Sequence, residues 1–171
     1  YIYENYEKKS VLSVETLAGI ILPVLDPKRN IIEVDMGEPK PQAEQELNVL
    51  DKTFKFIAVS MGNPHCVIFI DDVAKFDLAK YGPAIETHQL FPEKTNVEFI
   101  QILNNKEIKM RVWERGAGET LACGTGACAA AVASILNKNL ERSVTVHLPG
   151  GKLEIDWDSS DNHVAMAGPA Y

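Results

Sequence analysis

Short runs of apolar residues, many of them alternating with polar ones, recur along most of this chain and predict β-strands. The runs at 96–103 and 107–115 flank the turn-forming residues Asn104 and Asn105, which favours an antiparallel hairpin. The other predicted strands are 31–36, 54–61, 66–70, 144–148, 152–157 and 163–168.

Two segments have a helical pattern instead. Residues 125–137 are rich in alanine, contain no proline and lead into the polar sequence Asn-Lys-Asn, which suits a helix C-terminus. A shorter helix is indicated near 77–88, although Gly82 and Pro83 interrupt it. The expected fold class is α+β, with mostly antiparallel strands and one central helix.

The first part of the chain has its own pattern. Residues 10–25 contain short β-like segments around the turn-prone pair Ala18 and Gly19, which predicts a hairpin. The turn-forming sequence PVLDPKRN, residues 23–30, overlaps its end and indicates a domain boundary.

Composition narrows the functional class. The 171 residues suffice for one domain with a real core. Seventeen lysines and arginines against 24 aspartates and glutamates give a formal charge of −7 without any basic block, which argues against a nucleic-acid partner. No apolar run approaches the ~18 residues of a membrane span, and the first residues lack signal-peptide order. Three cysteines, an odd number, fit a reducing compartment, so we expect a cytoplasmic protein without a membrane partner.

The strongest chemical signal is Cys123, which lies where the alanine-rich helix should begin. The unpaired N–H groups and the positive dipole end of a first helical turn favour a negative charge, so we expect a lowered thiol pKa and a reactive thiolate. Gly124 and Gly126 leave the backbone bare beside the sulfur, where a substrate carboxylate could approach the same N–H groups.

Glu114 and Arg115 end the strand that leads into the glycine-rich segment before Cys123. A carboxylate beside a thiol can transfer protons or position a substrate ammonium group, and an arginine fork suits a carboxylate. The alternative is a surface ion pair without functional consequence.

A turn between two apolar strands carries Asn63 and His65. An asparagine side chain can both donate and accept, which suits an amino-acid head group, and histidine titrates near neutrality. A structural histidine is the alternative, and Asn96, at the start of a strand, can equally be a turn residue. Cys66 and Cys128 lie in apolar stretches and are expected to pack in the core.

Two other kinds of site fit the sequence less well. His65 and the three cysteines could supply four zinc ligands, but their spacing matches no common zinc motif, so we expect no metal. The residues at 124, 126 and 129 match a G-x-G-x-x-A nucleotide fingerprint, but a long segment separates them from the preceding strand, which makes that match weak.

Three blocks together, MGNPH at 61–65, TNVEF at 95–99 and ERGAGETLACGTGACA at 114–129, closely resemble the diaminopimelate epimerase family. The resemblance extends along nearly all of the chain but to only the later part of such an enzyme. It implies one half of a two-domain fold, with strands wrapped around a central helix. Residues 1–23 would then be the last hairpin of a missing N-terminal domain, and 24–171 the C-terminal domain.

The resemblance also implies a reaction that uses no cofactor and no metal. A cysteine from each half flanks the α-carbon of diaminopimelate, and LL-diaminopimelate is converted to the meso form, a precursor of lysine and peptidoglycan. Cys123 resembles the thiol of the second half, and Glu114 resembles its acidic neighbour in the site. His65 resembles the histidine that assists the thiol of the first half. The residues that resemble substrate-binding groups are Asn63, Asn96, Glu114, Arg115, Gly124 and Thr125.

The first-half cysteine motif has no counterpart in these residues, so we expect the chain alone not to epimerise diaminopimelate. Its partners would be the substrate, the missing N-terminal half and, through an apolar face left uncovered, a second copy in a homodimer. Another cofactor-independent racemase or isomerase of the superfamily, and a non-catalytic binding or assembly domain, stay open as alternatives.

Overall fold

The computed structural model describes residue 5 and residues 8–16 and 19–169. One sheet of 11 strands dominates it, in the order β3-β4-β13-β12-β11-β9-β8-β7-β6-β5, with β10 paired to β9. Strand β7 is parallel to its neighbour β8, and β9 is parallel to its neighbour β11. The other neighbouring strands of the sheet are antiparallel. The strands are β3 (Val24–Asp26), β4 (Ile31–Asp35), β5 (Lys40–Val49), β6 (Lys52–Ser60), β7 (Pro64–Phe69), β8 (Asn96–Ile102), β9 (Glu107–Glu114), β10 (Gly118–Thr120), β11 (Ser143–Leu148), β12 (Gly151–Trp157) and β13 (Val164–Gly168).

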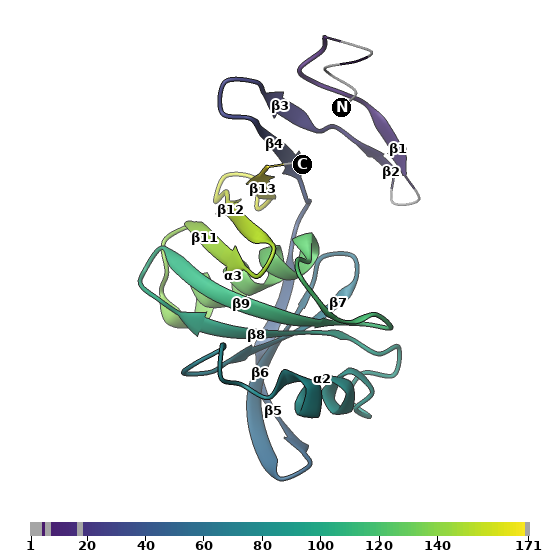
Figure 1. Cartoon of the computed structure of the whole chain (residues 1–171), viewed down its shortest axis with the longest axis vertical. Helices are drawn as coiled ribbons and strands as arrows, with labels where there is room; N and C mark the ends of the chain where they lie inside the picture. Colours follow the sequence, from purple (N-terminus) through teal and green to yellow (C-terminus); the bar gives the residue numbers. More distant parts are fainter. Residues whose placement is uncertain (1–4, 6–7, 17–18, 170–171) are drawn as a thin grey trace.

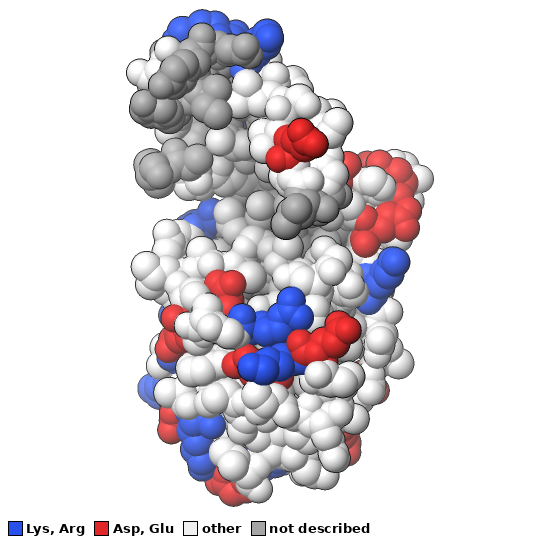
Figure 2. Space-filling view, turned by 90° about the vertical axis from the view of Figure 1, so that its right-hand side faces the viewer, with Lys and Arg blue, Asp and Glu red and all other residues white. Residues whose placement is uncertain are grey.

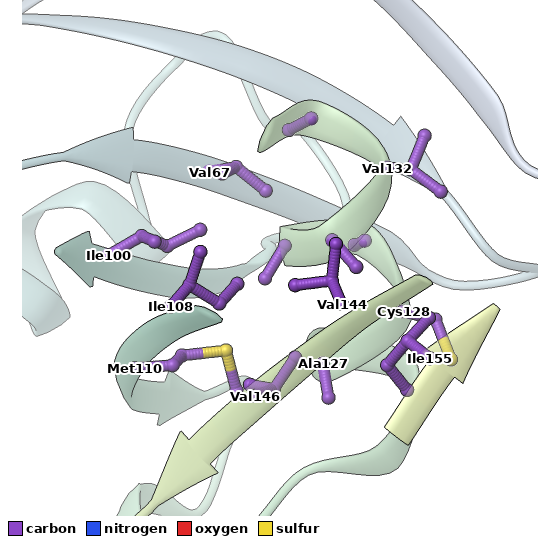
Figure 3. Packing of buried hydrophobic residues seen from close by; sticks show 14 of the residues in the cluster. Val67, Ile100, Ile108, Met110, Ala127, Cys128, Val132, Val144, Val146 and Ile155 are labelled. Carbon is purple, nitrogen blue, oxygen red and sulfur yellow. The ribbon is translucent and has the colours of Figure 1, made fainter. Parts of the chain in front are cut away.

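The sheet curves around helix α3 (Gly124–Lys138), which lies among the strands in Figure 1. Every residue from 126 to 135 is buried, so the helix is enclosed on all sides. Its small alanine side chains let the strands approach closely, and the larger side chains of the strands fill the space around it (Figure 3). This arrangement confirms the predicted α+β fold with a central helix.

Helix α2 (Leu78–Glu86) covers the other face of the sheet and has a second apolar cluster beneath it. Asp77 caps it by accepting a hydrogen bond from the Lys80 N–H. The predicted interruption does not occur, because the helix continues through Gly82 and Pro83. Gly82 is needed for packing, since a Cβ there would lie 2.7 Å from the ring of Trp113.

A separate two-stranded sheet precedes the main one. Strands β1 (Val14–Thr16) and β2 (Gly19–Ile21) pair antiparallel, as the sequence predicts, and the turn residue Ala18 lies outside the described residues. In Figure 1 this hairpin lies away from α3, and β3 is the first strand of the large sheet. The domain boundary at 23/24 stays a prediction.

Three strands were not predicted. Strand β5 is polar and mostly exposed on both faces, so its sequence lacks the alternation that marks a half-buried strand. Strands β3 and β10 have only three residues each, and β3 contains residues interpreted as turn formers. Both are stabilised by pairing with a neighbouring strand rather than by their own pattern.

Candidate active site

The turn between β6 and β7 brings Asn63 and His65 to the start of α3. Gly62 adopts a φ of 95°, and the Met61 N–H donates to the Asn63 carbonyl, which closes the turn. His65 is not a loop residue as expected, because it is the second residue of β7 and its side chain is fully buried. In β7 it shares with Val67 the face that packs against α3.

Glu98, which sequence reasoning missed, lies beside His65. Its Oε1 is 2.7 Å from His65 Nδ1, and both side chains are fully buried. Burial raises the pKa of the Glu98 carboxyl against the opposing effect of His65. Glu98 lies on the same inward face of β8 as Ile100, but both faces of this strand are buried, so no alternation in the sequence marked it.

A chain of polar contacts extends from this pair to the sulfur of Cys123. His65 Nε2 is 3.0 Å from Asn63 Oδ1, and the amide of Asn63 donates to Thr125 Oγ1 at 3.2 Å. Thr125 Oγ1 is in turn 3.7 Å from Cys123 Sγ. The structure therefore brings four of the predicted site residues together, with Glu98 as a fifth member.

Cys123 is the N-cap residue of α3, as predicted, with an extended backbone and 9% exposure. Its expected lowered pKa is wrong: burial raises the pKa of this thiol, and the charges of Glu98 and Glu114 act in the same direction. The Gly126 N–H and the Thr125 hydroxyl oppose this shift without overcoming it. Helix position alone did not decide the pKa, because desolvation and two nearby carboxylates disfavour the thiolate.

The segment that carries Glu114 and Arg115 is held from two sides. The Thr120 hydroxyl donates to the Glu114 carboxylate, and the Arg115 guanidinium donates to the Glu93 carbonyl at 3.1 Å. Neither side chain forms an ion pair with the other in the part of the chain that the structure describes.

Asn96 connects two of the site segments. Its Nδ2 donates to the Pro64 carbonyl, and its Oδ1 accepts from the Arg115 N–H, both at 3.0 Å. Each bond uses only part of the amide, so one N–H and one lone pair remain for another partner.

Cys66 and Cys128 are completely buried, as the sequence predicts. Burial raises the pKa of Cys66 well above its ordinary value and that of Cys128 to about 12. Neither sulfur can act as a base near neutral pH, which leaves Cys123 as the chemically useful thiol of the described residues.

Within the described ranges, no three His, Cys, Asp or Glu side chains are arranged to hold a metal ion, and no helix is long and apolar enough to cross a membrane. A groove of about 480 Å³ lies between β5, β6 and residues 90–95; His65 lines it, but Cys123 does not. On the face seen in Figure 2, basic and acidic side chains lie side by side.

Comparison with known proteins identifies the family. A sequence model described as diaminopimelate epimerase matches residues 57–171. The diaminopimelate epimerase of Moorella thermoacetica is 50% identical over 99% of this chain and 67% of its own length. The chain belongs to the diaminopimelate epimerase family. The corresponding proteins of Desulfitobacterium hafniense and Carboxydothermus hydrogenoformans are 52% and 54% identical, each over 99% of this chain and 66% of the relative. The chain thus spans about two thirds of the length of the diaminopimelate epimerases that it matches.

Solved structures agree on the fold of this diaminopimelate epimerase family member. A hydroxyproline epimerase from Agrobacterium vitis has a TM-score of 0.70 at 13% identity, and the match covers 94% of this chain and 56% of that one. A phenazine biosynthesis protein from Bacillus anthracis has a TM-score of 0.66 at 15% identity, covering 98% and 69%. At such low identity the likeness concerns the fold alone.

Proposed function

We propose that this chain carries one of two acid–base groups of a cofactor-independent epimerase that converts LL-diaminopimelate to the meso form. The observation that supports it most is the placement of the Cys123 sulfur at the first turn of α3, in contact with the Thr125–Asn63–His65 chain. Family membership and the names of its relatives support the substrate.

The first turn of α3 would hold the α-carboxylate of the substrate. The backbone N–H groups of Gly124 and Thr125 belong to the part of the helix that lacks intrahelical partners, so they can donate to an anion. Negative charge that develops beside this carboxylate, when the α-proton leaves, is stabilised by the same fixed dipoles.

Because its pKa is raised, Cys123 is in its thiol form near neutral pH. In one direction of the reaction the Cys123 thiol is the proton donor. A base on the opposite face of the substrate first removes the α-proton, and the electron pair stays on the α-carbon. The S–H bond of Cys123 then breaks, its proton passes to that carbon, and the thiolate remains. In the reverse direction the Cys123 thiolate removes the proton.

The second group must come from another segment, because the thiols of Cys66 and Cys128 are buried and are not ionised near neutral pH. We propose that it is a cysteine of the enzyme outside residues 1–171, so that this chain alone does not turn over diaminopimelate.

The distal end of diaminopimelate carries its own ammonium and carboxylate groups. Asn63, Asn96, Glu114 and Arg115 are proposed to bind it, the carboxylate of Glu114 toward the ammonium and the Arg115 fork toward the carboxylate. Both residues lie at the end of β9 and start of the following turn, next to Asn96.

Incubation with LL-diaminopimelate in deuterated water tests the proposal. We expect deuterium in the α-position and meso product only when the N-terminal part of a relative is supplied in trans. Cys123→Ser should abolish both, while Cys128→Ala should retain them, and proline serves as the control substrate. Robust turnover by the lone chain, or preference for proline, would contradict the proposal.

A further inference from the structure

Glu98 is a carboxyl group in a place where the fold alone would favour an apolar side chain. It lies between Val97 and Phe99 in β8, and its side chain has no exposure to solvent. Burial of an ionisable group costs free energy unless partners compensate for the lost water. Only one of its two oxygens is compensated, because Oε2 has no hydrogen-bond partner among the described residues.

The space around α3 is adapted to this carboxyl. A Cβ on Gly126 would lie 2.8 Å from Glu98 Oε1 and 3.1 Å from Cys123 Sγ. The carboxyl oxygen and the sulfur therefore both approach the bare Cα of the same glycine, one from β8 and the other from the N-cap. Any larger residue at 126 would push one of them away.

We infer that Glu98 is a positioning residue that holds a shared proton with His65 and thereby controls the ionisation of Cys123. This inference rests on the proposed role of Cys123 as an acid–base group. Glu98 does not contact the substrate in this scheme. It acts through His65, whose second nitrogen faces Asn63, and through its own charge beside the sulfur.

The ionisable groups around Glu98 determine whether it favours or disfavours the thiolate of Cys123. His65 comes from β7, Glu114 from β9 and Cys123 from the start of α3, while Cys66 of β7 lies on the opposite face of the sheet and feels Glu98 only through its charge. His65 is the one that can share a proton with Glu98 at 2.7 Å, and the pair is neutral overall whichever of the two holds it. Loss of that proton leaves a net negative charge beside Cys123, which disfavours the thiolate.

Alkylation of the purified chain across pH, combined with NMR titration of the His65 ring, tests the inference. Glu98→Gln removes the charge and keeps the shape. We expect Cys123 alkylation in this variant to be faster by roughly threefold or more at the alkaline end of the profile, where the unsubstituted pair has lost its shared proton and is negatively charged; this corresponds to a downward shift of about half a pH unit. The pH response of the His65 ring signals should also change, because Nδ1 loses the carboxyl partner at 2.7 Å.

The matched control is Glu107→Gln. Glu107 forms a similar pair with His147, at 2.6 Å, but this pair is partly exposed and Glu107 does not affect the Cys123 thiol. Its substitution should leave the Cys123 profile unchanged. Unchanged alkylation and an unchanged His65 titration in Glu98→Gln would overturn the inference and leave Glu98 as a packing residue.

A measurement on the unsubstituted chain keeps the inference testable if Glu98→Gln does not fold. The pH at which the His65 ring shifts change should coincide with an inflection in the alkylation rate of Cys123, and independent inflections would overturn it. Neither measurement uses substrate, so an absence of epimerase activity would bear on the proposed function and leave this result intact.

Discussion

The Thr125 hydroxyl accepts a hydrogen bond from the Asn63 side chain at 3.2 Å, across 62 residues of sequence. This bond joins the turn before β7 to the first turn of α3. Two segments that the sequence shows only as separate motifs are thus fixed relative to each other, and the Cys123 sulfur lies 3.7 Å from the same hydroxyl.

Thr125→Val removes this hydroxyl while keeping the shape of the side chain. We expect slower alkylation of Cys123 at pH 8, because the hydroxyl favours the thiolate, and a loss of about 1 kcal/mol in unfolding free energy. Thr53→Val is the control, since Thr53 makes a comparable bond to Asn48 in the exposed β5–β6 hairpin. Equal alkylation rates in the two variants would show that the bond does not influence the thiol.

The raised pKa of Cys123 gives a direct prediction for pH dependence. The thiolate is the nucleophile, so the alkylation rate of Cys123 should continue to rise above pH 9, where an ordinary cysteine thiol has its pKa. Cys66 and Cys128 should stay unmodified in the folded chain because they are completely buried. A plateau at or below pH 8, measured by mass spectrometry of labelled peptides, would contradict the raised pKa.

The sequence predicted the elements whose burial follows a simple period. Strands β8 and β9 and helix α3 have the apolar patterns that their surroundings require, whereas β5 is mostly exposed, buries only Leu47 and Val49 near its end, and carries no such pattern over most of its length. The expected start of the alanine-rich helix identified Cys123 as a site candidate, the turn between two apolar strands identified Asn63 and His65, and the family blocks contain all three.

Neither the buried position of Glu98 nor the raised pKa of Cys123 could be predicted from such patterns. A single glutamate in an apolar strand looks the same whether it faces solvent or a helix, and here both faces of β8 are covered. The pKa of Cys123 depends on how deeply α3 is enclosed and on charges from β8 and β9, which only the assembled sheet brings together.

Gly126→Ala should disturb the site from within α3. Its Cβ would lie 2.8 Å from Glu98 Oε1 and 3.1 Å from Cys123 Sγ, so one of them must shift. We expect a loss of about 1–3 kcal/mol in unfolding free energy, despite the better helix propensity of alanine, and altered Cys123 alkylation. Gly124→Ala is the stability control, because its Cβ would meet only the flexible end of Met166. If both variants unfold at the same denaturant concentration, the space beside Gly126 is not tight.

Glu86 stabilises the segment that carries the proposed distal binding residues, and its substitution should reveal this through pH. Its carboxylate accepts hydrogen bonds from Trp113 Nε1 at 2.8 Å and from the Gly116 N–H at 3.0 Å, and Lys94 lies 3.6 Å away. Although burial opposes them, these contacts lower the pKa of Glu86 below its ordinary 4.5. The stabilisation is therefore fully present above pH 4.5 and is lost as the pH falls through the lower folded-state pKa.

Glu86→Gln should cost about 1–2 kcal/mol of unfolding free energy at pH 7, and the difference from the unsubstituted chain should shrink toward pH 3. Glu44→Gln, in an exposed ion pair with Lys55, should cost little at either pH. A Glu86→Gln deficit that stays constant from pH 7 to pH 3 in urea unfolding would show that charge at this position does not hold the segment.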